Sequence, residues 1–254
     1  MADLSLSPSR TSRTLGEKVA DDSPSPPLRR VVLQGKETAL VPLDALRHGA
    51  ALYSISHGTP EKESVWAYLG YGPFETLEAM GGFLEECQRS DDPRFFAVTE
   101  PSHGRAVGVV SFLRFDRPSR CIELGHIWYG VSHHRRRTNT EAVYLLLREA
   151  FDHLHCRRVE WKCDARNRRS WKAAERLGFQ FEGLFRQHRI VKGRNRDTAW
   201  FSMLDTEWPR VRRALERWLD WGKGKPPSLA SLREKSTIRR AGSVGSPTPL
   251  GARR

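Results

Sequence analysis

One strand-like run contains two side chains that can accept a proton, Glu123 and His126. Both lie in the run CIELGHIWY, residues 121–129. A carboxylate or an imidazole beside a reacting group can act as a general base, and the unperturbed pKa of histidine lies close to neutral pH. Alternation along a strand puts Glu123 on one face and His126 on the other, so we expect that they do not act together. The competing interpretations are a Glu123 carboxylate paired with a nearby arginine and a His126 ring without a catalytic role.

Two polar residues, Asn167 and Ser170, stand at the start of a short predicted helix. A turn at residues 164–167 comes before this helix, which runs to Leu177, and Gly178 follows as the residue after its C-cap. Amide and hydroxyl side chains at a helix start can bind a ligand. They are also ordinary N-terminal capping residues. The two roles can coexist.

The chain has a formal net charge of +13, and much of the excess lies in two regions. Residues 223–254 look like a solvated basic tail. Residues 135–196 are rich in arginine and overlap the candidate site. The positive electrostatic potential of these arginines suits an anionic ligand that carries several phosphates. Nucleic acid would suit the same charge. No nucleic-acid recognition motif accompanies the charge, so this interpretation ranks last.

The composition predicts one domain between two tails. Residues 1–28 and 222–254 are rich in Ser, Pro and mixed charge and are predicted to be disordered, which leaves a domain at 29–221. No apolar run approaches the ~18 residues of a membrane span. The four cysteines form no CxxC pair and no metal-ligand spacing, so we expect buried free thiols and no metal site. A soluble, cytoplasmic protein is the prediction.

The hydrophobic pattern predicts a mixed α/β domain. Predicted helices cover residues 44–52, 75–88, 140–153, 170–177 and 208–221, and predicted strands cover 38–43, 94–100, 105–115, 121–129 and 157–163. A hairpin follows around residues 192–195. The order is strand, two helices, three strands, helix, strand, helix, two strands and a final helix.

Three segments carry a resemblance to a known family: Thr140-Glu141-Ala142, the run EWKCDARNRRSWKAAERLGFQFEG and the run KGRNRDTAWFS. They resemble the cofactor-binding half of the GNAT acetyltransferase superfamily, most closely its RimJ/RimL-like branch, over roughly 30–221. The resemblance implies a mixed, mostly antiparallel sheet with splayed central strands and flanking helices. It also implies an N-acyltransferase that moves an acetyl group from acetyl-CoA to an amine by direct attack. The acceptor would be a small molecule or a protein N-terminus, and no metal is required.

The resemblance assigns the donor site to a loop and a strand. The family's pyrophosphate loop falls on residues 134–139, directly before Thr140, where first-turn amides and the helix dipole bind phosphate. The loop lacks the family's glycines, so its side chains either crowd the phosphates or bind them through arginine. Backbone groups of the strand would pair with the pantetheine arm, and one N–H would stabilise the oxyanion. The implied cofactor-binding residues are Trp128, Tyr129, Val131, His134, Arg135, Arg136, Arg137, Thr138, Asn139, Thr140 and Asn167.

The resemblance also implies catalytic roles. Glu123 matches a position where related enzymes often carry a glutamate that acts through water, and Ser170 matches a serine that protonates the leaving thiolate. Ala174 stands where many members carry a tyrosine. His126 and His188 are further candidates at the substrate site. A second hypothesis, supported by the missing glycines, is a protein of the same fold that no longer catalyses and serves as a binding module.

Overall fold

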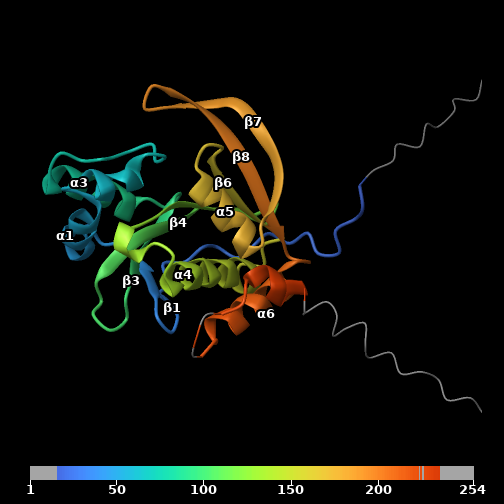
Figure 1. The fold of residues 1–254 in the computed structure, drawn as a ribbon. Coiled ribbons are helices and arrows are strands. Elements are labelled where there is room, and N and C mark those ends of the chain that lie inside the picture. The colour runs from blue at the N-terminus through green and yellow to red at the C-terminus, as the bar shows by residue number, and fades with distance from the viewer. Residues whose placement is uncertain (1–15, 223, 225, 235–254) are drawn as a thin grey trace, which may run out of the picture.

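The computed structural model describes residues 16–222, 224 and 226–234, and it has one eight-stranded sheet with helices on both faces (Figure 1). The strand order is β1-β2-β3-β4-β5-β6-β8-β7. Neighbouring strands are antiparallel except for β5 and β6, which are parallel. The predicted mixed, mostly antiparallel sheet is confirmed.

Groups of strands and groups of helices follow one another along the chain. The strands are β1 (Leu33–Gln34), β2 (Ala39–Pro42), β3 (Arg94–Thr99), β4 (Ala106–Asp116), β5 (Cys121–Tyr129), β6 (Arg158–Asp164), β7 (Gln180–Val191) and β8 (Arg194–Leu204). The helices are α1 (Ala45–Ser56), α2 (Pro60–Glu63), η1 (Ser64–Trp66), α3 (Leu77–Arg89), η2 (Val131–His133), α4 (Arg137–Arg148), η3 (Glu149–His153), α5 (Arg168–Leu177) and α6 (Trp208–Leu219). Residues 229–234 are also helical.

Local capping explains where several helices begin and end. Asp44 caps α1, because its carboxylate accepts a hydrogen bond from the Arg47 N–H (2.8 Å), as the sequence predicted. The next long helix begins slightly later than predicted, because the Thr76 hydroxyl caps it. Gly178 ends α5 with a φ of 108°, a left-handed conformation that glycine adopts without strain.

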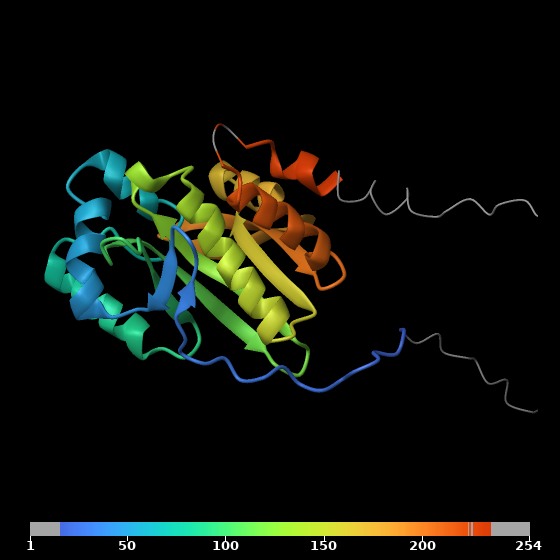
Figure 2. The same ribbon diagram turned by 90° about the horizontal axis from the view of Figure 1, so that it is seen from below.

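The sheet is covered on both faces, and its core divides accordingly. Figure 2 shows α4 lying across one face with α6 beside it. The α4 side holds a cluster that includes Phe96, Val110, Phe112, Ile122, Leu124, Val143, Leu146 and Leu147. On the other face, α1 and α3 bury a cluster that includes Leu52, Trp66, Met80, Leu84, Phe95, Val109 and Trp128. Adjacent strand residues such as Phe95 and Phe96 thus face opposite layers, as strand alternation requires.

A bulge in β5 bends this strand away from β6. The register between β4 and β5 shifts between Val109 and Ser111, because β5 has one residue more over this stretch. His126 lies there with a φ of 51°. A bulge disrupts pairing locally and increases the twist of the strand. The β5–β6 ladder ends just before it, at the pair Leu124–Trp161, so the predicted splay of the central strands is confirmed.

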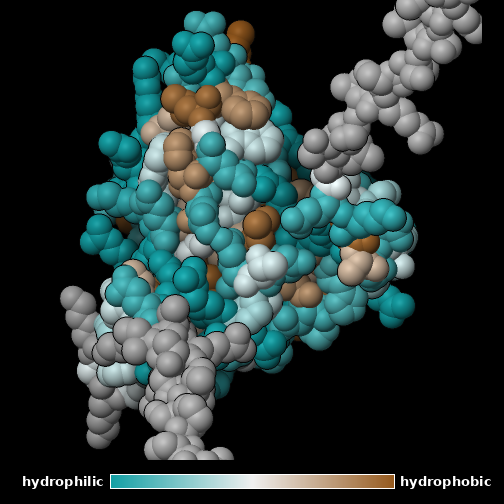
Figure 3. All heavy atoms as spheres, turned by 90° about the vertical axis from the view of Figure 1, so that its right-hand side faces the viewer, coloured by the Kyte–Doolittle hydropathy of each residue, from teal (hydrophilic) through white to brown (hydrophobic). Residues whose placement is uncertain are grey.

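The β7–β8 hairpin extends beyond the sheet and arches over one of its faces (Figure 1). Its turn uses Lys192 and Gly193, both with positive φ. Four apolar side chains along the edge strand β7 are exposed: Phe181, Leu184, Phe185 and Ile190. Figure 3 shows apolar side chains gathered on the upper part of a largely hydrophilic face, at the height of this hairpin.

Both predicted tails include residues that pack on the domain. Leu229 and Leu232 are buried, and the Arg233 Nη1 donates to the Arg176 carbonyl at the end of α5 (2.8 Å). At the other end, Ser25 exchanges two hydrogen bonds with Arg117. The domain was predicted to end at residue 221. Residues 229–234 lie beyond that boundary and nevertheless pack on the core through two buried leucines. Residues 1–15 and 235–254 of the predicted tails lie outside the described residues.

Three other expectations concern membranes, cysteines and metals. Within residues 16–222, 224 and 226–234, no helix has the length and apolar character that crossing a bilayer requires. The four cysteines are unpaired; Cys121 is half-buried and the other three are buried. The same residues contain no group of three or more His, Cys, Asp or Glu side chains placed to hold a metal ion.

Candidate active site

The candidate active site lies where β5 and β6 separate. Their ladder ends at Leu124–Trp161, although β5 continues to Tyr129 and β6 continues to Asp164. Beyond this point the facing strand edges carry backbone N–H and C=O groups with no partner in the opposite strand. Such groups require hydrogen bonds from another source. The opening can therefore receive an extended ligand whose own amides pair with a strand edge.

The N-terminus of α4 follows the end of β5 and is not capped by a side chain. Arg136 occupies the N-cap position without a side-chain hydrogen bond to the helix. By contrast, α1, α3 and α5 are each capped by a side chain. The first N–H groups of a helix have no intrahelical partner, and the helix dipole is positive there. This uncapped end is therefore suited to bind an anion, as phosphate-binding helices do.

The loop before α4 makes its turn without glycine. Arg135 has a φ of 61°, so a non-glycine residue adopts the left-handed conformation at this point. The side chains of Arg135 and Arg136 are exposed, which leaves both guanidinium groups accessible to an anion. Arg136 Nε also donates to the Ser132 carbonyl (3.3 Å). These two arginines therefore stay candidates for the predicted direct binding of phosphates by side chains.

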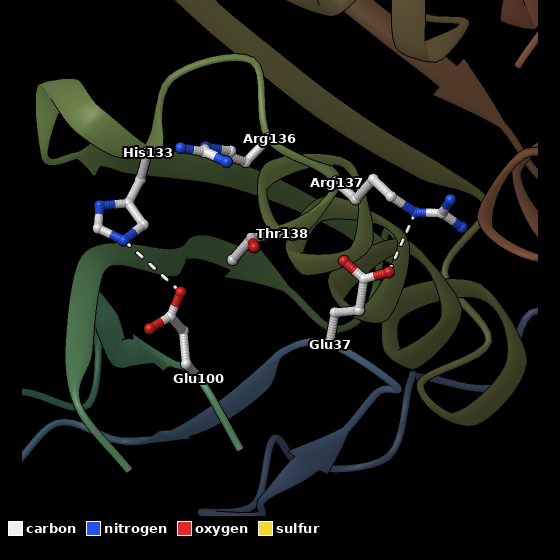
Figure 4. Close-up of a pocket in the computed structure, with 6 residues that line it drawn as sticks. All are labelled: Glu37, Glu100, His133, Arg136, Arg137 and Thr138. Atoms are coloured by element: carbon white, nitrogen blue, oxygen red, sulfur yellow. Dashed lines mark ion pairs between the residues drawn. The ribbon is translucent and has the colours of Figure 1, made fainter. Parts of the chain in front are cut away.

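The Arg137 side chain has a different role from the predicted one. Its guanidinium donates to the carbonyls of Leu219 and Trp221 (3.0 Å for Trp221), just at the C-terminal end of α6. Its Nε lies 3.1 Å from Glu37 Oε1 (Figure 4). A cation at a helix C-terminus is favoured by the dipole and by the unpaired carbonyls there. The Arg137 side chain therefore joins α4 to α6 and does not serve the phosphates, whereas its backbone N–H remains in the first turn of α4.

A hollow of about 380 Å³ lies beside this loop and is lined by Glu37, Glu100, His133, Arg136, Arg137 and Thr138 (Figure 4). Figure 4 shows side chains of both charges facing it, and His133 Nε2 lies 3.6 Å from Glu100 Oε1. Thr138 is buried, and its carbonyl accepts a hydrogen bond from Thr38 Oγ1 (3.4 Å). The hollow therefore provides polar space next to the α4 N-terminus.

Two buried polar atoms near the start of α4 have no hydrogen-bond partner within the described part of the chain. They are Asn139 Oδ1 and the Tyr129 hydroxyl. Thr140 Oγ1 accepts a hydrogen bond from Arg176 Nη2 (3.0 Å), so Arg176 reaches from α5 to α4. Buried polar atoms without a partner are uncommon in folded proteins. Their presence beside an arginine fits a polar ligand at this end of the opening.

The strand edge predicted to face the pantetheine arm is partly occupied. His134 Nε2 donates to the Tyr129 carbonyl (3.2 Å). Trp128 is buried and packs against Trp66, with ring centroids 4.8 Å apart, so its side chain belongs to the core. The half-buried Val131 begins the short helix η2. The Gly125 carbonyl accepts a hydrogen bond from Ser111 Oγ (3.0 Å), so residues 126–128 are left as the candidate edge at the opening.

Asn167 and Ser170 lie on the other side of the opening, at the start of α5. Asn167 caps this helix, because its Oδ1 accepts the Ser170 N–H (3.1 Å). The Ser170 hydroxyl accepts a hydrogen bond from Trp161 Nε1 (3.0 Å), and Trp161 forms the last rung of the β5–β6 ladder. Because its oxygen accepts this bond, the Ser170 hydroxyl keeps a proton to donate; Ser170 also hydrogen-bonds with the neighbouring Cys163, whose pKa is raised by burial and lowered in part by this bond. Ala174 is fully buried one turn later and offers no hydroxyl.

Glu123 is part of a buried ion-pair network. Its Oε2 accepts hydrogen bonds from Arg114 Nη1 and Lys162 Nζ, both at 2.8 Å. Lys162 Nζ also lies 2.7 Å from Glu160 Oε2. The Glu123 side chain is only 7% exposed, so water has little access to it. Glu123 therefore forms the arginine pair named above as its competing interpretation, and we do not assign it the role of a base acting through water.

His126 lies on the same face as Glu123, contrary to the prediction from alternation. The bulge shifts the alternation by one residue, and the His126 ring stacks on Tyr71 (centroids 5.6 Å) and contacts Phe95, on the face opposite α4. Its Nδ1 lies 3.2 Å from the Tyr71 hydroxyl. Burial, with a contribution from Arg114, lowers the pKa of His126 to about 4. The imidazole is therefore neutral at neutral pH and only a weak proton acceptor.

His188 is placed by a second bulge, in β7. The register with β8 shifts between Phe185 and Arg189, and Gln187 has a φ of 49°. His188 Nδ1 lies 3.0 Å from Thr198 Oγ1. Slight burial, followed by nearby cations of which Arg189 contributes most, lowers the pKa of His188. This half-buried ring is neutral at neutral pH and lies on the face over which the hairpin arches.

The chain is similar to known acetyltransferases in sequence and in structure. The acetyltransferase (GNAT) domain matches residues 40–180. The chain belongs to the GNAT acetyltransferase family. A GCN5-related N-acetyltransferase structure from Brucella melitensis is 40% identical, with a TM-score of 0.79, and the match covers 84% of this chain and 98% of that one. A structure from Chromobacterium violaceum, described as a probable acetyltransferase of the GNAT family, is also 40% identical, with a TM-score of 0.72 and coverage of 77% and 97%.

A curated relative gives the same result at lower identity. The uncharacterized N-acetyltransferase p20 of Bacillus licheniformis is 31% identical over 147 residues, which is 57% of this chain and 82% of p20. For this GNAT protein, the opening between β5 and β6 is consequently the candidate acetyl-donor site.

Sequence reasoning missed several residues of the site. Arg114 and Lys162 hold Glu123, Tyr71 contacts His126, and Arg176 binds Thr140. One signal was available for Lys162: every second residue from Arg158 to Asp164 is charged, which indicates a strand face that is not apolar. The other contacts join segments far apart in the sequence and have no local signal.

Proposed function

We propose that this protein transfers an acetyl group from acetyl-CoA to an amine acceptor by direct attack. The observation that carries the proposal is the opening that begins at Leu124–Trp161, with the uncapped N-terminus of α4 on one side and the Ser170 hydroxyl on the other. A ligand with phosphates at one end and an extended amide-containing arm fits this combination of groups.

Separate parts of the chain would hold the donor. The N–H groups of the first turn of α4 and the guanidinium groups of Arg135 and Arg136 would bind the pyrophosphate. The edge at residues 126–128 would pair with the amides of the arm. The hollow of Figure 4 adds polar space beside the phosphates. The positive φ of Arg135 supports a working loop, because the turn forms without the family's glycines.

The transfer step needs one proton acceptor and one proton donor. The acceptor nitrogen attacks the thioester carbonyl carbon, the new C–N bond forms, and the C–S bond breaks. We propose that His188 takes the amine proton, because its ring is neutral and one nitrogen is held by Thr198. The Ser170 hydroxyl donates to the departing thiolate, His188 releases the amine proton to solvent, and Ser170 regains a proton from solvent. Cations near His188 also disfavour the ammonium form of the acceptor.

Release of the CoA thiol in the presence of a panel of amines tests the proposal. We expect amine-dependent thiol release that saturates with acetyl-CoA, together with direct binding of acetyl-CoA by calorimetry. Binding without amine-dependent turnover would favour the alternative of a non-catalytic binding module. Absence of acetyl-CoA binding would refute the assignment of the opening.

A further inference from the structure

We propose that the face formed by β6, β8 and β7 under the hairpin binds an anionic group, a carboxylate or a phosphate, that the acceptor amine carries. This inference rests on the proposed function, because it names the chemical class of the acceptor for the same site. Three observations support it: unpartnered donors, unpaired cations and two long-range contacts that bridge the face at its ends.

The first observation is an excess of hydrogen-bond donors on β8. Arg196 Nε and Trp200 Nε1 are both buried, and neither has an acceptor within hydrogen-bond distance among residues 16–222, 224 and 226–234. Arg196, Thr198 and Trp200 alternate along the strand and therefore share a face, opposite the buried Phe201. Buried donors without acceptors are costly unless a ligand provides the acceptor. The missing partner is therefore an acceptor-rich group.

The second observation is the charge around His188. Four cations lie near its ring, and each contributes to its lowered pKa: Arg189, Arg196, Arg114 and Lys162. Arg114 and Lys162 are paired with Glu123, whereas the described part of the chain contains no ion pair to Arg189 or Arg196. Lys162 Nζ lies 3.7 Å from the centre of the Trp200 ring, a second favourable contact for this cation. Asp164 and Glu123 act on Arg196 through space, but among the described residues neither Arg189 nor Arg196 has an ion-pair partner in direct contact.

The nearby carboxylates have other partners. Asp164 Oδ1 accepts the Arg166 N–H (2.8 Å). Asp197 Oδ1 accepts the Gln187 N–H (2.7 Å) and the Asn195 Nδ2 (3.0 Å). These bonds hold the β6–α5 turn and the hairpin bulge in shape. Neither carboxylate forms an ion pair with Arg196.

The third observation is that two long-range contacts bridge the face at its ends. Lys192 Nζ, at the hairpin tip, donates to the Trp66 carbonyl (2.8 Å), and the Tyr68 hydroxyl donates to the Arg166 carbonyl (3.2 Å). These contacts join the hairpin and the β6–α5 turn to the segment after α2, so they hold the cations of the face in place for a bound group.

Strand geometry limits the size of the acceptor. Lys162 pairs with Trp200 across β6 and β8, one residue beyond the rung at which the opening begins. Arg196 lies four residues further along β8, which is about 13 Å at a rise of ~3.3 Å per residue. An amine at the opening and an anion at Arg196 can therefore belong to one extended molecule about as long as a tetrapeptide.

Matched pairs of amines test the proposal. The pairs are triglycyl-serine amide with triglycyl-O-phosphoserine amide, and triglycyl-asparagine amide with triglycyl-aspartate amide, so one arm tests phosphate and the other tests carboxylate. We expect at least one anionic member to have a kcat/KM about tenfold or more above its neutral partner. Arg196→Gln and, independently, the exposed Arg189→Gln should remove most of this preference. Arg213→Gln on α6 changes the net charge equally and should keep it.

Measuring the binding of the anionic probes tests the proposal even if no acetyl transfer is detected. Tryptophan fluorescence follows the binding of each anionic probe to the wild type, Arg196→Gln and Arg213→Gln proteins, and the donor site is common to all three. We expect about tenfold weaker binding only for Arg196→Gln. Equal kcat/KM within both pairs, or no loss of probe binding on Arg196→Gln, would overturn the anion site. Binding that depends on Arg196 without thiol release for any amine would instead refute the proposed transferase activity.

Discussion

Replacing Ser170 by alanine separates the structural role of this side chain from its proposed role as proton donor. The cap of α5 survives the change, because Asn167 Oδ1 accepts the backbone N–H of residue 170 (3.1 Å). The change does remove the acceptor of the Trp161 Nε1 hydrogen bond (3.0 Å). Leaving that buried donor unpaired costs about 1–3 kcal/mol of unfolding free energy. For a domain of this size, each kcal/mol lowers Tm by roughly 2–4 °C.

The expected effect on catalysis is larger than the effect on stability. If the Ser170 hydroxyl protonates the thiolate, Ser170→Ala should lower kcat by about 10²-fold or more. The affinity for acetyl-CoA should change little, because the thiolate forms only during the reaction. Thiol release gives kcat, calorimetry gives the affinity, and thermal unfolding gives the stability.

Trp161→Phe provides the matched control. It removes the same hydrogen bond from the other partner but keeps the Ser170 hydroxyl. We expect a comparable loss of Tm and a kcat within a few-fold of the wild type. If Ser170→Ala lowers kcat no more than Trp161→Phe does, Ser170 has no part in proton transfer, and water protonates the thiolate.

Three further predictions concern the donor loop, the C-terminal segment and one ion pair. Changing Arg135 and Arg136 together to alanine should weaken acetyl-CoA binding more than tenfold in calorimetry, whereas Arg137→Ala should lower Tm and leave the affinity unchanged. A chain that ends at residue 221 should melt at a lower temperature than one that ends at 234, because buried leucines contribute about 1.5–3 kcal/mol each; equal Tm values would contradict the packing of residues 229–234. Hydrogen bonds from Arg158 lower the pKa of Glu182 from 4.5 to about 2. The ionised Glu182 therefore stabilises the fold fully above pH 4.5, and this stabilisation is lost as the pH falls toward 2. Glu182→Gln should therefore lower Tm at pH 7. The difference in Tm between this variant and the wild type should become smaller as the pH falls from 4.5 toward 2.

Local sequence signals predicted the elements of the site well. Asp44 and Asn167 are capping residues and Gly178 adopts a left-handed conformation, so each acts within a few residues of its own position. Such effects depend on backbone geometry that the local sequence controls. The separation of β5 from β6 was predicted from the family resemblance. That resemblance is also found in continuous segments of the sequence.

The roles of individual side chains could not be predicted in this way. Strand alternation put Glu123 and His126 on opposite faces, but one extra residue in β5 places both on the same face. Arg137 lies in the predicted phosphate loop, yet its guanidinium binds carbonyls more than eighty positions later in the chain. A one-residue bulge and a distant helix end have no signature in the neighbouring sequence.

The sequence by itself determined the family, the order of strands and helices, and the loop and helix starts around the opening, because periodicity and capping act over short distances along the chain. Only the tertiary structure decided which charged side chains of the site already have an ion-pair partner within the protein. Glu123 is occupied by Arg114 and Lys162, while Arg189 and Arg196 form no ion pair with any residue that the structure describes. The reason is physical: ion pairing and burial depend on which strands lie side by side, and that is decided by the packing of the whole sheet.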